Sequence, residues 1–394
     1  MSPAGMKAEI AISGLGVVSA AGGDVATSLR TLRTGRRPEW IVCPFAKLPV
    51  ELPMFAVSGG PDVDRTFHLA MQAVGQALAD ADLDSLPNGF RLGVCLGTTV
   101  ACQLNDIPFY AEYRATGNPS LEPVERFAAG SLAERVARAT RANGPILTVV
   151  NACSSGTDAM GVAMAWLRAG RCDAVLAGGA DELSPIPTAG FHALGLTSPE
   201  PCKPFDRTRR GLNLGEGAGM VVLERADSVA RRGRKSNLFA VGFGSASDGY
   251  HLTAPHPEGL GLELAIRAAL NEAGIESAAV DFVNAHGTST PENDRIEGTT
   301  LARIFGAEVR AISTKGATGH TLGAAGGIET VFTALALREG WISPCIGFAE
   351  RDEGIPFAPM TGVTPVIRRH ALSTSLAFGG NNAAVLLERR EKPA

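Results

Sequence analysis

Cys153 stands where a strand-like run of β-branched and apolar residues gives way to a helical pattern, in the sequence V-V-N-A-C-S-S-G. The N-terminus of a helix carries partial positive charge and free N–H groups, which favour a thiolate over a thiol and can hold an oxyanion. The position is therefore typical of a nucleophile. A small buried hydrophobic residue is the ordinary alternative for a single cysteine, and the motif alone leaves both interpretations open.

Two histidines in the second half of the chain lie at the ends of strand-like runs, each among glycine and hydroxyl residues. They are His286 in D-F-V-N-A-H-G-T-S-T and His320 in S-T-K-G-A-T-G-H-T-L-G. Such a setting favours a side chain that points into a cleft rather than into a core. Either histidine alone could be structural, but two of them with one thiol form a set that thioester chemistry can use.

The composition excludes several classes of partner and site. The chain has 394 residues, 45% of them hydrophobic and 19% charged, and its formal net charge of −4 gives no overall attraction to nucleic acid or anionic membranes. Seven cysteines at irregular spacing, without a C-x-x-C pair, argue against a disulfide framework and against a zinc site. We therefore expect a cytoplasmic protein that holds no metal.

The apolar segment from Ile10 to Ala21 could be mistaken for part of a signal peptide. It contains glycines at positions 14 and 16, and a similar stretch begins at Leu238 in mid-chain, so a strand is the better interpretation. No other apolar run approaches the length of a membrane span.

Short motifs recur in the same order in the two parts of the chain, offset by roughly 165 to 190 residues. V-C-L-G-T-T from Val94 resembles V-N-A-H-G-T-S-T from Val283, and A-G-M-V-V-L-E-R from Ala218 resembles A-A-V-L-L-E-R-R from Ala383. Such a recurrence is typical of a duplicated chain.

The duplication predicts two homologous halves, residues 1–235 and 236–394. Each half alternates strand-like and helical runs, which predicts an α/β fold with a mostly parallel sheet covered by helices. Two such sheets packed around a shared helix layer would bring the Cys153 strand end near those of His286 and His320. The site would then lie between the halves.

Five motifs, taken together, are highly specific. They are N-A-C-S-S-G at Cys153, P-F-D-R-T-R-R-G-L-N-L-G-E-G-A-G from Pro204, N-A-H-G-T-S-T at His286, S-T-K-G-A-T-G-H at His320 and A-F-G-G-N-N-A from Ala377. Over nearly its whole length the chain resembles the elongating β-ketoacyl-acyl carrier protein synthases, condensing enzymes of the Cys-His-His type. The resemblance implies a thiolase-like fold in which two duplicated halves form a layered αβαβα architecture.

The resemblance implies a ping-pong Claisen condensation in which Cys153 takes an acyl chain from the phosphopantetheine of acyl carrier protein. Malonyl-carrier protein then loses carbon dioxide, and its carbanion attacks the Cys153 thioester. His286 and His320, as neutral imidazoles, would donate hydrogen bonds to the malonyl thioester carbonyl and stabilise the enolate. Substrates travel on carrier-bound phosphopantetheine, and no separate cofactor is implied.

Residues around these three match supporting positions of the family. Lys315 and Glu329 match an ion pair that orients His320. The backbone N–H groups of Cys153 and Phe378 match an oxyanion hole, and the Phe378 ring matches an aromatic gate that admits the acyl chain.

Polar residues that follow His286 match further family positions. Thr288 and Thr290 match hydroxyls that hydrogen-bond the pantetheine arm. Asp294 and Glu297 fall at positions that look structural and would place the His286 loop.

Arg207, Arg209 and Arg210 follow Phe205 in a loop where relatives present positive charge near the mouth of the site. We expect these arginines to help dock the acidic carrier protein, a local attraction that the net charge conceals. A salt-bridged loop is the alternative.

The chain departs from the common elongating pattern at several positions. Ala377 replaces the glycine before the gating phenylalanine, Asn381 a threonine and Arg210 an aspartate, while G-L-N-L-G-E-G replaces G-F-V-x-G-E-G. Alanine should stiffen the gate, because it lacks the backbone freedom of glycine. These departures resemble ketosynthases of bacterial polyene or type II polyketide pathways, which pair with a cysteine-less chain-length partner.

Fatty acid, polyketide and polyene biosynthesis stay open as pathways, and the dimer could be a homodimer or a heterodimer with a chain-length-factor-like subunit. A thiolase would need a second reactive cysteine, and Cys345 in S-P-C-I-G lacks that setting. His320 argues against enzymes of the Cys-His-Asn type, and the duplicated organisation argues against a cysteine protease. Cys153 speaks against a non-catalytic subunit that only shapes a partner's tunnel.

Overall fold

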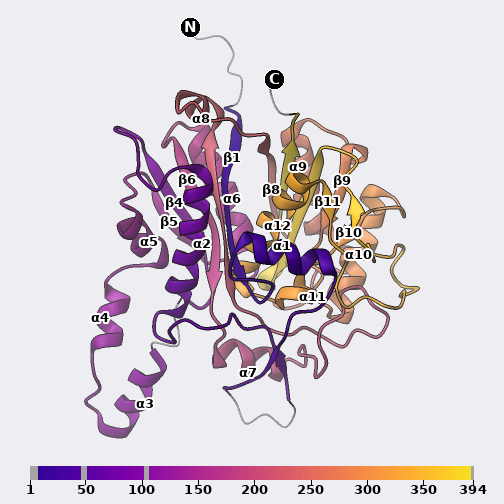
Figure 1. Cartoon of the computed structure of the whole chain (residues 1–394). Coiled ribbons are helices and arrows are strands. Elements are labelled where there is room, and N and C mark those ends of the chain that lie inside the picture. The colour runs from indigo at the N-terminus through magenta and orange to yellow at the C-terminus, as the bar shows by residue number, and fades with distance from the viewer. Residues whose placement is uncertain (1–7, 46–50, 102–105, 392–394) are drawn as a thin grey trace.

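A ten-stranded mixed sheet forms the centre of the computed structural model, which describes residues 8–45, 51–101 and 106–391 (Figure 1). The strand order is β10-β9-β13-β14-β8-β1-β7-β6-β4-β5. The first five strands are β1 (Ile10–Ser19), β4 (Leu92–Gly97), β5 (Ile146–Val149), β6 (Ala174–Asp181) and β7 (Gly217–Arg225). The other five are β8 (Leu238–Ser247), β9 (Val280–Asn284), β10 (Ala311–Ile312), β13 (His370–Ala377) and β14 (Asn381–Arg389).

The two sets of five strands are arranged alike. Counted outward from the centre, the first set runs β1-β7-β6-β4-β5 and the second runs β8-β14-β13-β9-β10, which is the same order relative to the chain. The sets meet where β1 and β8 share one residue pair, Ala11 with Phe239. This repeated order supports the proposal that residues 1–235 and 236–394 are duplicated halves.

The expectation of a mostly parallel sheet is wrong. In each half the outer pairs are parallel, β4 with β5 and β6 and likewise β9 with β10 and β13. The inner pairs, β6 with β7, β7 with β1, β13 with β14 and β14 with β8, are antiparallel. A run of apolar residues shows that a strand is buried on both faces, but it does not show in which direction its neighbours run.

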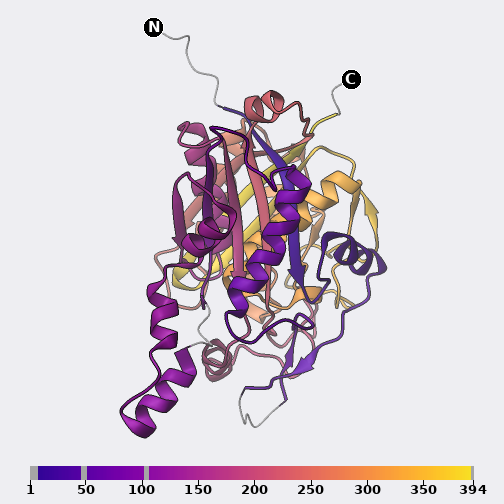
Figure 2. The same cartoon turned by 60° about the vertical axis from the view of Figure 1, so that its left-hand side comes forward.

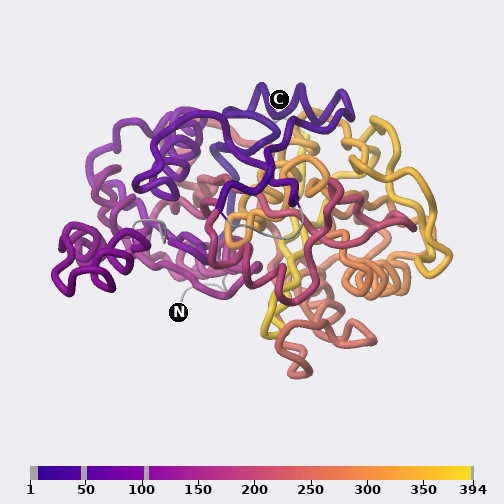
Figure 3. The backbone as a smooth tube through the Cα atoms, turned by 90° about the horizontal axis from the view of Figure 1, so that it is seen from below, coloured from indigo at the N-terminus to yellow at the C-terminus, as the bar shows by residue number. Residues whose placement is uncertain are grey.

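Helices form three layers around the two halves of the sheet. Helices α6 (Ser155–Arg168) and α12 (Ala325–Glu339) contact strands of both halves and make the middle layer. The first half is covered on its outer face by α2 (Arg65–Ala81) and α5 (Leu132–Thr140), and the second by α9 (Leu260–Ala273) and α10 (Pro291–Phe305). Figure 3 shows the two halves side by side, with the early residues in indigo and the late ones in yellow.

The core follows these layers. The largest apolar cluster lies around the middle helices and includes Met160 and Met164 of α6 with Val331 and Leu335 of α12. Separate apolar clusters lie under the outer helices of each half. The strands that carry the site are therefore held on both faces.

The remaining elements lie at the periphery or near the site. They are α1 (Val25–Thr34), β2 (Ile41–Val42), β3 (Pro53–Met54), α3 (Asp106–Thr116), α4 (Glu122–Ala128), α7 (Pro185–Ala193), α8 (Ala226–Arg231), η2 (Ser277–Ala279), α11 (Lys315–Thr318), η3 (Leu322–Ala324), β11 (Trp341–Ile342), β12 (Thr364–Pro365) and η4 (Phe378–Gly380). Helices α3 and α4 project from the body of the molecule (Figure 2). Within the described ranges, no helix combines the length and the apolar character needed to cross a membrane.

Candidate active site

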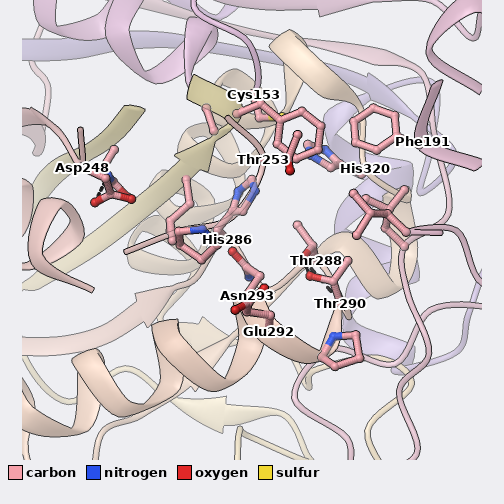
Figure 4. A pocket seen from close by; sticks show the side chains of 18 residues that line it. Cys153, Phe191, Asp248, Thr253, His286, Thr288, Thr290, Glu292, Asn293 and His320 are labelled. Carbon is pink, nitrogen blue, oxygen red and sulfur yellow. Dashed lines mark hydrogen bonds between the residues drawn. The ribbon is translucent and has the colours of Figure 1, made fainter. Parts of the chain in front are cut away.

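Cys153, His286 and His320 line one cavity of about 180 Å³, on which their side chains converge (Figure 4). Cys153 lies between β5 and α6, His286 follows β9, and His320 lies between α11 and η3. The thiol thus comes from the first half of the chain and the imidazoles from the second. The three residues that the sequence analysis singled out lie together in space.

A sharp turn places Cys153 at the start of α6. Ala152, the residue before it, has a φ of +48°, a left-handed conformation that is costly for a residue with a Cβ. Ser155 holds this turn, because its Oγ donates to the Ala152 carbonyl at 2.6 Å and accepts from the Asn151 N–H at 2.7 Å. Backbone strain of this kind is found most often at functional sites.

Burial dominates the chemistry of the Cys153 thiol. The side chain is 5% exposed, and burial raises its pKa to about 11. Lys315 and the backbone N–H groups of Phe378 and Cys153 act in the opposite direction. The helix start was expected to favour the thiolate, but desolvation of the buried side chain is the larger effect, so the resting group is a thiol.

Both imidazoles are neutral. Burial lowers the pKa of His286 well below its usual value, and Lys315 lowers it further; the same two causes lower the pKa of His320. Their ring centroids are 5.2 Å apart and their planes lie at 85°. Two uncharged imidazoles therefore face the thiol.

Hydrogen bonds assign the tautomer of each imidazole. His286 Nδ1 lies 3.2 Å from the Lys315 Nζ, and His320 Nδ1 accepts from the Leu322 N–H at 3.3 Å. Because each Nδ1 is an acceptor, each Nε2 carries the proton. Both rings can then donate an N–H into the cavity.

Lys315 and Glu329 form a buried ion pair behind His286. Lys315 also donates to the His286 carbonyl at 2.7 Å. Burial raises the pKa of Glu329 to about 7, and Lys315 acts in the opposite direction. The pair was expected to orient His320, but its direct contacts are with His286, because Lys315 opens α11 and reaches back to the end of β9.

Phe378 lies on the wall of the cavity next to a second aromatic ring. Its ring centroid is 5.2 Å from that of Phe191, which in turn is 6.4 Å from that of His320. The Phe378 backbone N–H is directed at the Cys153 sulfur. No sequence pattern pointed to Phe191, because α7 carries no motif beyond its apolar residues.

The backbone conformations around Phe378 show which positions require glycine. Ala377 is extended, with φ −133° and ψ 154°, whereas Gly379 and Gly380 have φ values of +83° and +78°. Alanine fits an extended backbone without strain, so this conformation does not require glycine, and stiffening at position 377 stays a prediction. The left-handed positions that need glycine follow the phenylalanine. Asn381 lies beside them and its Nδ2 donates to the Phe378 carbonyl at 3.4 Å.

Thr288 and Thr290 line the cavity below the His286 ring, and their hydroxyl oxygens are 2.9 Å apart. Both side chains are largely buried and lie on the loop that leads into α10. They can present hydroxyl groups to a polar ligand in the cavity.

Asp294 and Glu297 hold the loop that carries His286, in agreement with the structural role expected for them. Glu297 accepts from the N–H groups of His286 at 2.8 Å and of Gly287 at 2.7 Å, and burial raises its pKa to about 7. Asp294 accepts from the Ser289 N–H at 3.0 Å. Two buried carboxyl groups thus fix the backbone beside the first imidazole.

The three arginines after Phe205 differ in their surroundings. Arg209 is buried and donates to Asp352 and to two backbone carbonyls, so the prediction that it docks a carrier protein is wrong. Arg207 is half exposed and pairs with Glu350 at 2.6 Å. Arg210 is exposed, with its nearest acidic partner 3.9 Å away. Docking stays a prediction for Arg207 and Arg210.

Asp181 was missed by the sequence analysis. It is fully buried at the end of β6 and accepts from the Thr98 hydroxyl at 2.6 Å, the Val100 N–H at 2.9 Å and the Gly323 N–H at 2.7 Å. It therefore ties the end of β4 to the turn that follows His320. An acid directly after the apolar run V-L-A-G-G-A was the available signal.

Comparisons with known proteins place these observations in a wider context. The family model of the β-ketoacyl synthase N-terminal domain matches residues 53–228, and that of the C-terminal domain matches residues 239–349. The chain is 33% identical to a 3-oxoacyl-[acyl-carrier-protein] synthase 2 of Staphylococcus aureus over 97% of its own length and 98% of the relative's.

Two solved structures are similar over almost the whole chain. The ishigamide ketosynthase/chain length factor matches with a TM-score of 0.91 and 29% identity, covering 98% of this chain and 100% of that one. The ketosynthase ApeO of Xenorhabdus doucetiae, solved in complex with its chain length factor ApeC, matches with a TM-score of 0.84 and 29% identity. That match covers 99% of this chain and 100% of the other.

Proposed function

The chain belongs to the β-ketoacyl synthase family of acyltransferases, and from this premise we propose that it condenses a Cys153-bound acyl chain with malonyl-acyl carrier protein. One observation carries the proposal. A buried thiol at a helix start shares one cavity with two neutral imidazoles whose Nε2–H groups are free to donate. Decarboxylative Claisen condensation needs these groups, a nucleophile and two donors for an enolate oxygen.

The first step transfers the acyl chain to Cys153. The sulfur attacks the thioester carbonyl of acyl-carrier protein, the bond to the pantetheine sulfur breaks, and the Cys153 proton ends on that leaving sulfur. The backbone N–H groups of Cys153 and Phe378, which point at the nucleophilic sulfur, serve as the oxyanion hole. Burial raises the pKa of the thiol to about 11, so the resting group must lose its proton for the sulfur to attack.

The second step generates the carbanion. The bond between the malonyl carboxylate and its methylene carbon breaks, carbon dioxide leaves, and the electron pair moves into an enolate. The His286 and His320 Nε2–H groups donate to the thioester oxygen on which this charge develops. The enolate carbon then attacks the Cys153 thioester, and the carbon–sulfur bond breaks to release the Cys153 thiolate. The thiolate takes a proton from water to return to the resting thiol, and the β-ketoacyl chain leaves on the carrier protein.

The surroundings of the imidazoles suit this task. Burial, together with the positive charge of Lys315, keeps both rings neutral, and Glu329 compensates that charge. We assign pantetheine binding to Thr288 and Thr290, and gating of the acyl chain to Phe378. Phosphopantetheine carries both substrates, and no step requires a further cofactor.

A ketosynthase subunit that acts only with a chain-length-factor-like partner is the second candidate. The solved relatives include ketosynthases paired with chain length factors, and they match this chain over nearly its full length. The sheet edge supports a partner subunit, because the edge strand β5 exposes Ile146 and Leu147, and Val150 beyond it is 69% exposed. Either a second copy or a homologous partner would cover this edge.

We also propose a cytoplasmic location and carrier-protein docking at Arg207 and Arg210. The described cysteines are free thiols, as expected in a reducing compartment.

Arg207 and Arg210 are the exposed arginines of the loop after Phe205 and present positive charge to an acidic carrier protein. Reversing both to glutamate should raise the KM for acyl-carrier protein and leave kcat unchanged.

Mass spectrometry of carrier-bound products tests the proposed condensation. Purified protein mixed with acyl- and malonyl-carrier protein should yield a β-ketoacyl chain two carbons longer, and the Cys153→Ala variant should yield none. Acylation of Cys153 without elongation would favour the heterodimeric subunit. No acylation at all would overturn the condensing function.

A further inference from the structure

Asn213 is a buried amide within the apolar stretch G-L-N-L. On one side of it Leu212 lines the cavity, and on the other Leu214 packs in the apolar cluster that contains Phe191. Asn213 itself is 2% exposed. A polar side chain this deeply buried is kept by its hydrogen bonds, so its partners indicate what it holds.

The backbone of this stretch carries His320. The Asn213 carbonyl accepts from the His320 N–H at 2.8 Å, and the Gly215 N–H donates to the His320 carbonyl at 3.0 Å. Leu214 and His320 form an isolated parallel bridge. The second imidazole is thus attached to residues 213–215 as if to a short strand.

The Asn213 side chain fixes a second loop. Its Oδ1 accepts from the Cys202 N–H at 2.6 Å, and its Nδ2 donates to the Ser198 carbonyl at 2.9 Å. An apolar side chain of the same size would fill the space but leave both backbone groups buried and unpaired. Each such group costs about 1–3 kcal/mol.

The loop fixed by Asn213 leads on to the first imidazole. Cys202 donates from its Sγ to the Lys315 carbonyl at 3.3 Å, and the Lys315 Nζ lies 3.2 Å from His286 Nδ1. Asn213 therefore contacts the backbone of one histidine directly and reaches the lysine behind the other through one residue.

We infer that Asn213 is a positioning residue that holds His320 and the Lys315 segment in register, so that both imidazoles reach one thioester oxygen. The inference rests on the proposed function. It separates two parts of the reaction, because Cys153 is held by its own turn at Ala152 and Ser155 and does not depend on Asn213. Loss of the amide should therefore impair decarboxylation more than acylation.

Two half-reactions measured on the full chain test this separation. Conversion of malonyl- to acetyl-carrier protein reports on the imidazoles, and acylation of Cys153 by acyl-carrier protein reports on the thiol. The Asn213→Leu variant should slow decarboxylation about 10- to 100-fold, as expected for a small misplacement of donors, while acylation stays within about threefold. The Asn213→Asp variant keeps the shape and the acceptor for the Cys202 N–H but loses the donor to the Ser198 carbonyl, so decarboxylation should fall with this variant as well, again more than acylation.

Asn143 offers a control with the same pattern of backbone hydrogen bonds at an exposed position. Its Oδ1 accepts from the Leu92 N–H at 3.1 Å and its Nδ2 donates to the Phe90 carbonyl at 3.1 Å, away from the site. Asn143→Leu should leave the ratio of the two half-reactions unchanged. Equal loss in both half-reactions for Asn213→Leu, or no loss in either, would overturn the inference, whereas an inactive wild-type chain would overturn the proposed function itself.

Discussion

At the scale of single residues, the buried thiol sets the first expectation. Burial raises the pKa of Cys153 to about 11. As the pH rises toward that value, the thiolate fraction therefore grows about tenfold for each pH unit. Alkylation of Cys153 by iodoacetamide should therefore accelerate continuously from pH 6.5 to 9.5. Peptide mass spectrometry measures the rate at this residue, with Cys153→Ala as the control. A plateau near pH 7 would show that the helix start, and not burial, governs the thiol.

The charge of Lys315 sets a second expectation at this scale. Lys315 lowers the pKa of both catalytic imidazoles in addition to burial. In the Lys315→Met, Glu329→Gln double variant, which removes both charges of the pair, these pKa values should rise and stay below the ordinary value because burial persists. NMR titration of labelled histidine measures the shift. Unchanged titration curves would contradict the electrostatic role of Lys315.

Sequence motifs located the reactive residues but not their partners. Cys153, His286 and His320 stand in short motifs whose residue types report their chemistry. The contact of Lys315 with His286 and the burial of Arg209 depend on side chains that come from distant segments. Such contacts follow from packing and leave no local pattern in the sequence.

At the scale of elements, the segment that carries Phe378 can be tested by exchanging its small residues. Ala377 is extended, so Ala377→Gly should change the acylation rate less than about twofold. Gly379 has a φ of +83°, so Gly379→Ala should cost about 1–2 kcal/mol in this conformation and slow acylation of Cys153. Quenched assays of Cys153 acylation compare the rates of the two variants. Equal effects would mean that the hinge does not lie after the phenylalanine.

The strands and helices were largely predictable from the sequence, whereas the relative directions of neighbouring strands were not. Apolar runs such as V-L-A-G-G in β6 and M-V-V-L-E in β7 do form buried strands. These two neighbours run antiparallel, although the alternation of strands and helices had suggested parallel pairs. The end of β6 at Asp181 pairs with the start of β7 at Gly217, so the connection between them, residues 182–216 with α7, leaves and returns at the same end of the sheet. A connection of this length allows either direction, which is why the alternation did not reveal it.

At the scale of the whole molecule, the open sheet edge predicts an assembly. The edge strand β5 exposes Ile146 and Leu147, and an exposed apolar edge pairs readily with another chain. Light scattering should therefore give a mass above the 40.8 kDa of one chain, either alone or with a chain-length-factor-like partner. Leu147→Lys should lower that mass, with Leu264→Lys on the exposed face of α9 as a control. A monomeric chain that elongates acyl groups would contradict this expectation.

The recurrence of motifs and the family resemblance predicted the layered architecture, but they did not predict the spacing between the layers. That spacing depends on glycines that allow one backbone to lie directly against another. A Cβ at Gly156 in α6 would lie 2.7 Å from the Gly327 nitrogen of α12, and a Cβ at Gly327 would lie 2.5 Å from the Gly219 carbonyl of β7. Real side chains do not come this close.

The contact between Gly156 and Gly327 also tells an engineer where the enzyme can be altered. A methyl group at either position would act as a wedge between the helix that starts at Cys153 and the helix that follows His320. Substrate range should therefore be widened by trimming side chains that line the cavity, such as Phe191, and not by any change in the glycine layer. The distance between the Cys153 thiol and the imidazoles thus depends on backbone contacts that are possible only because Gly156 and Gly327 have no Cβ atom.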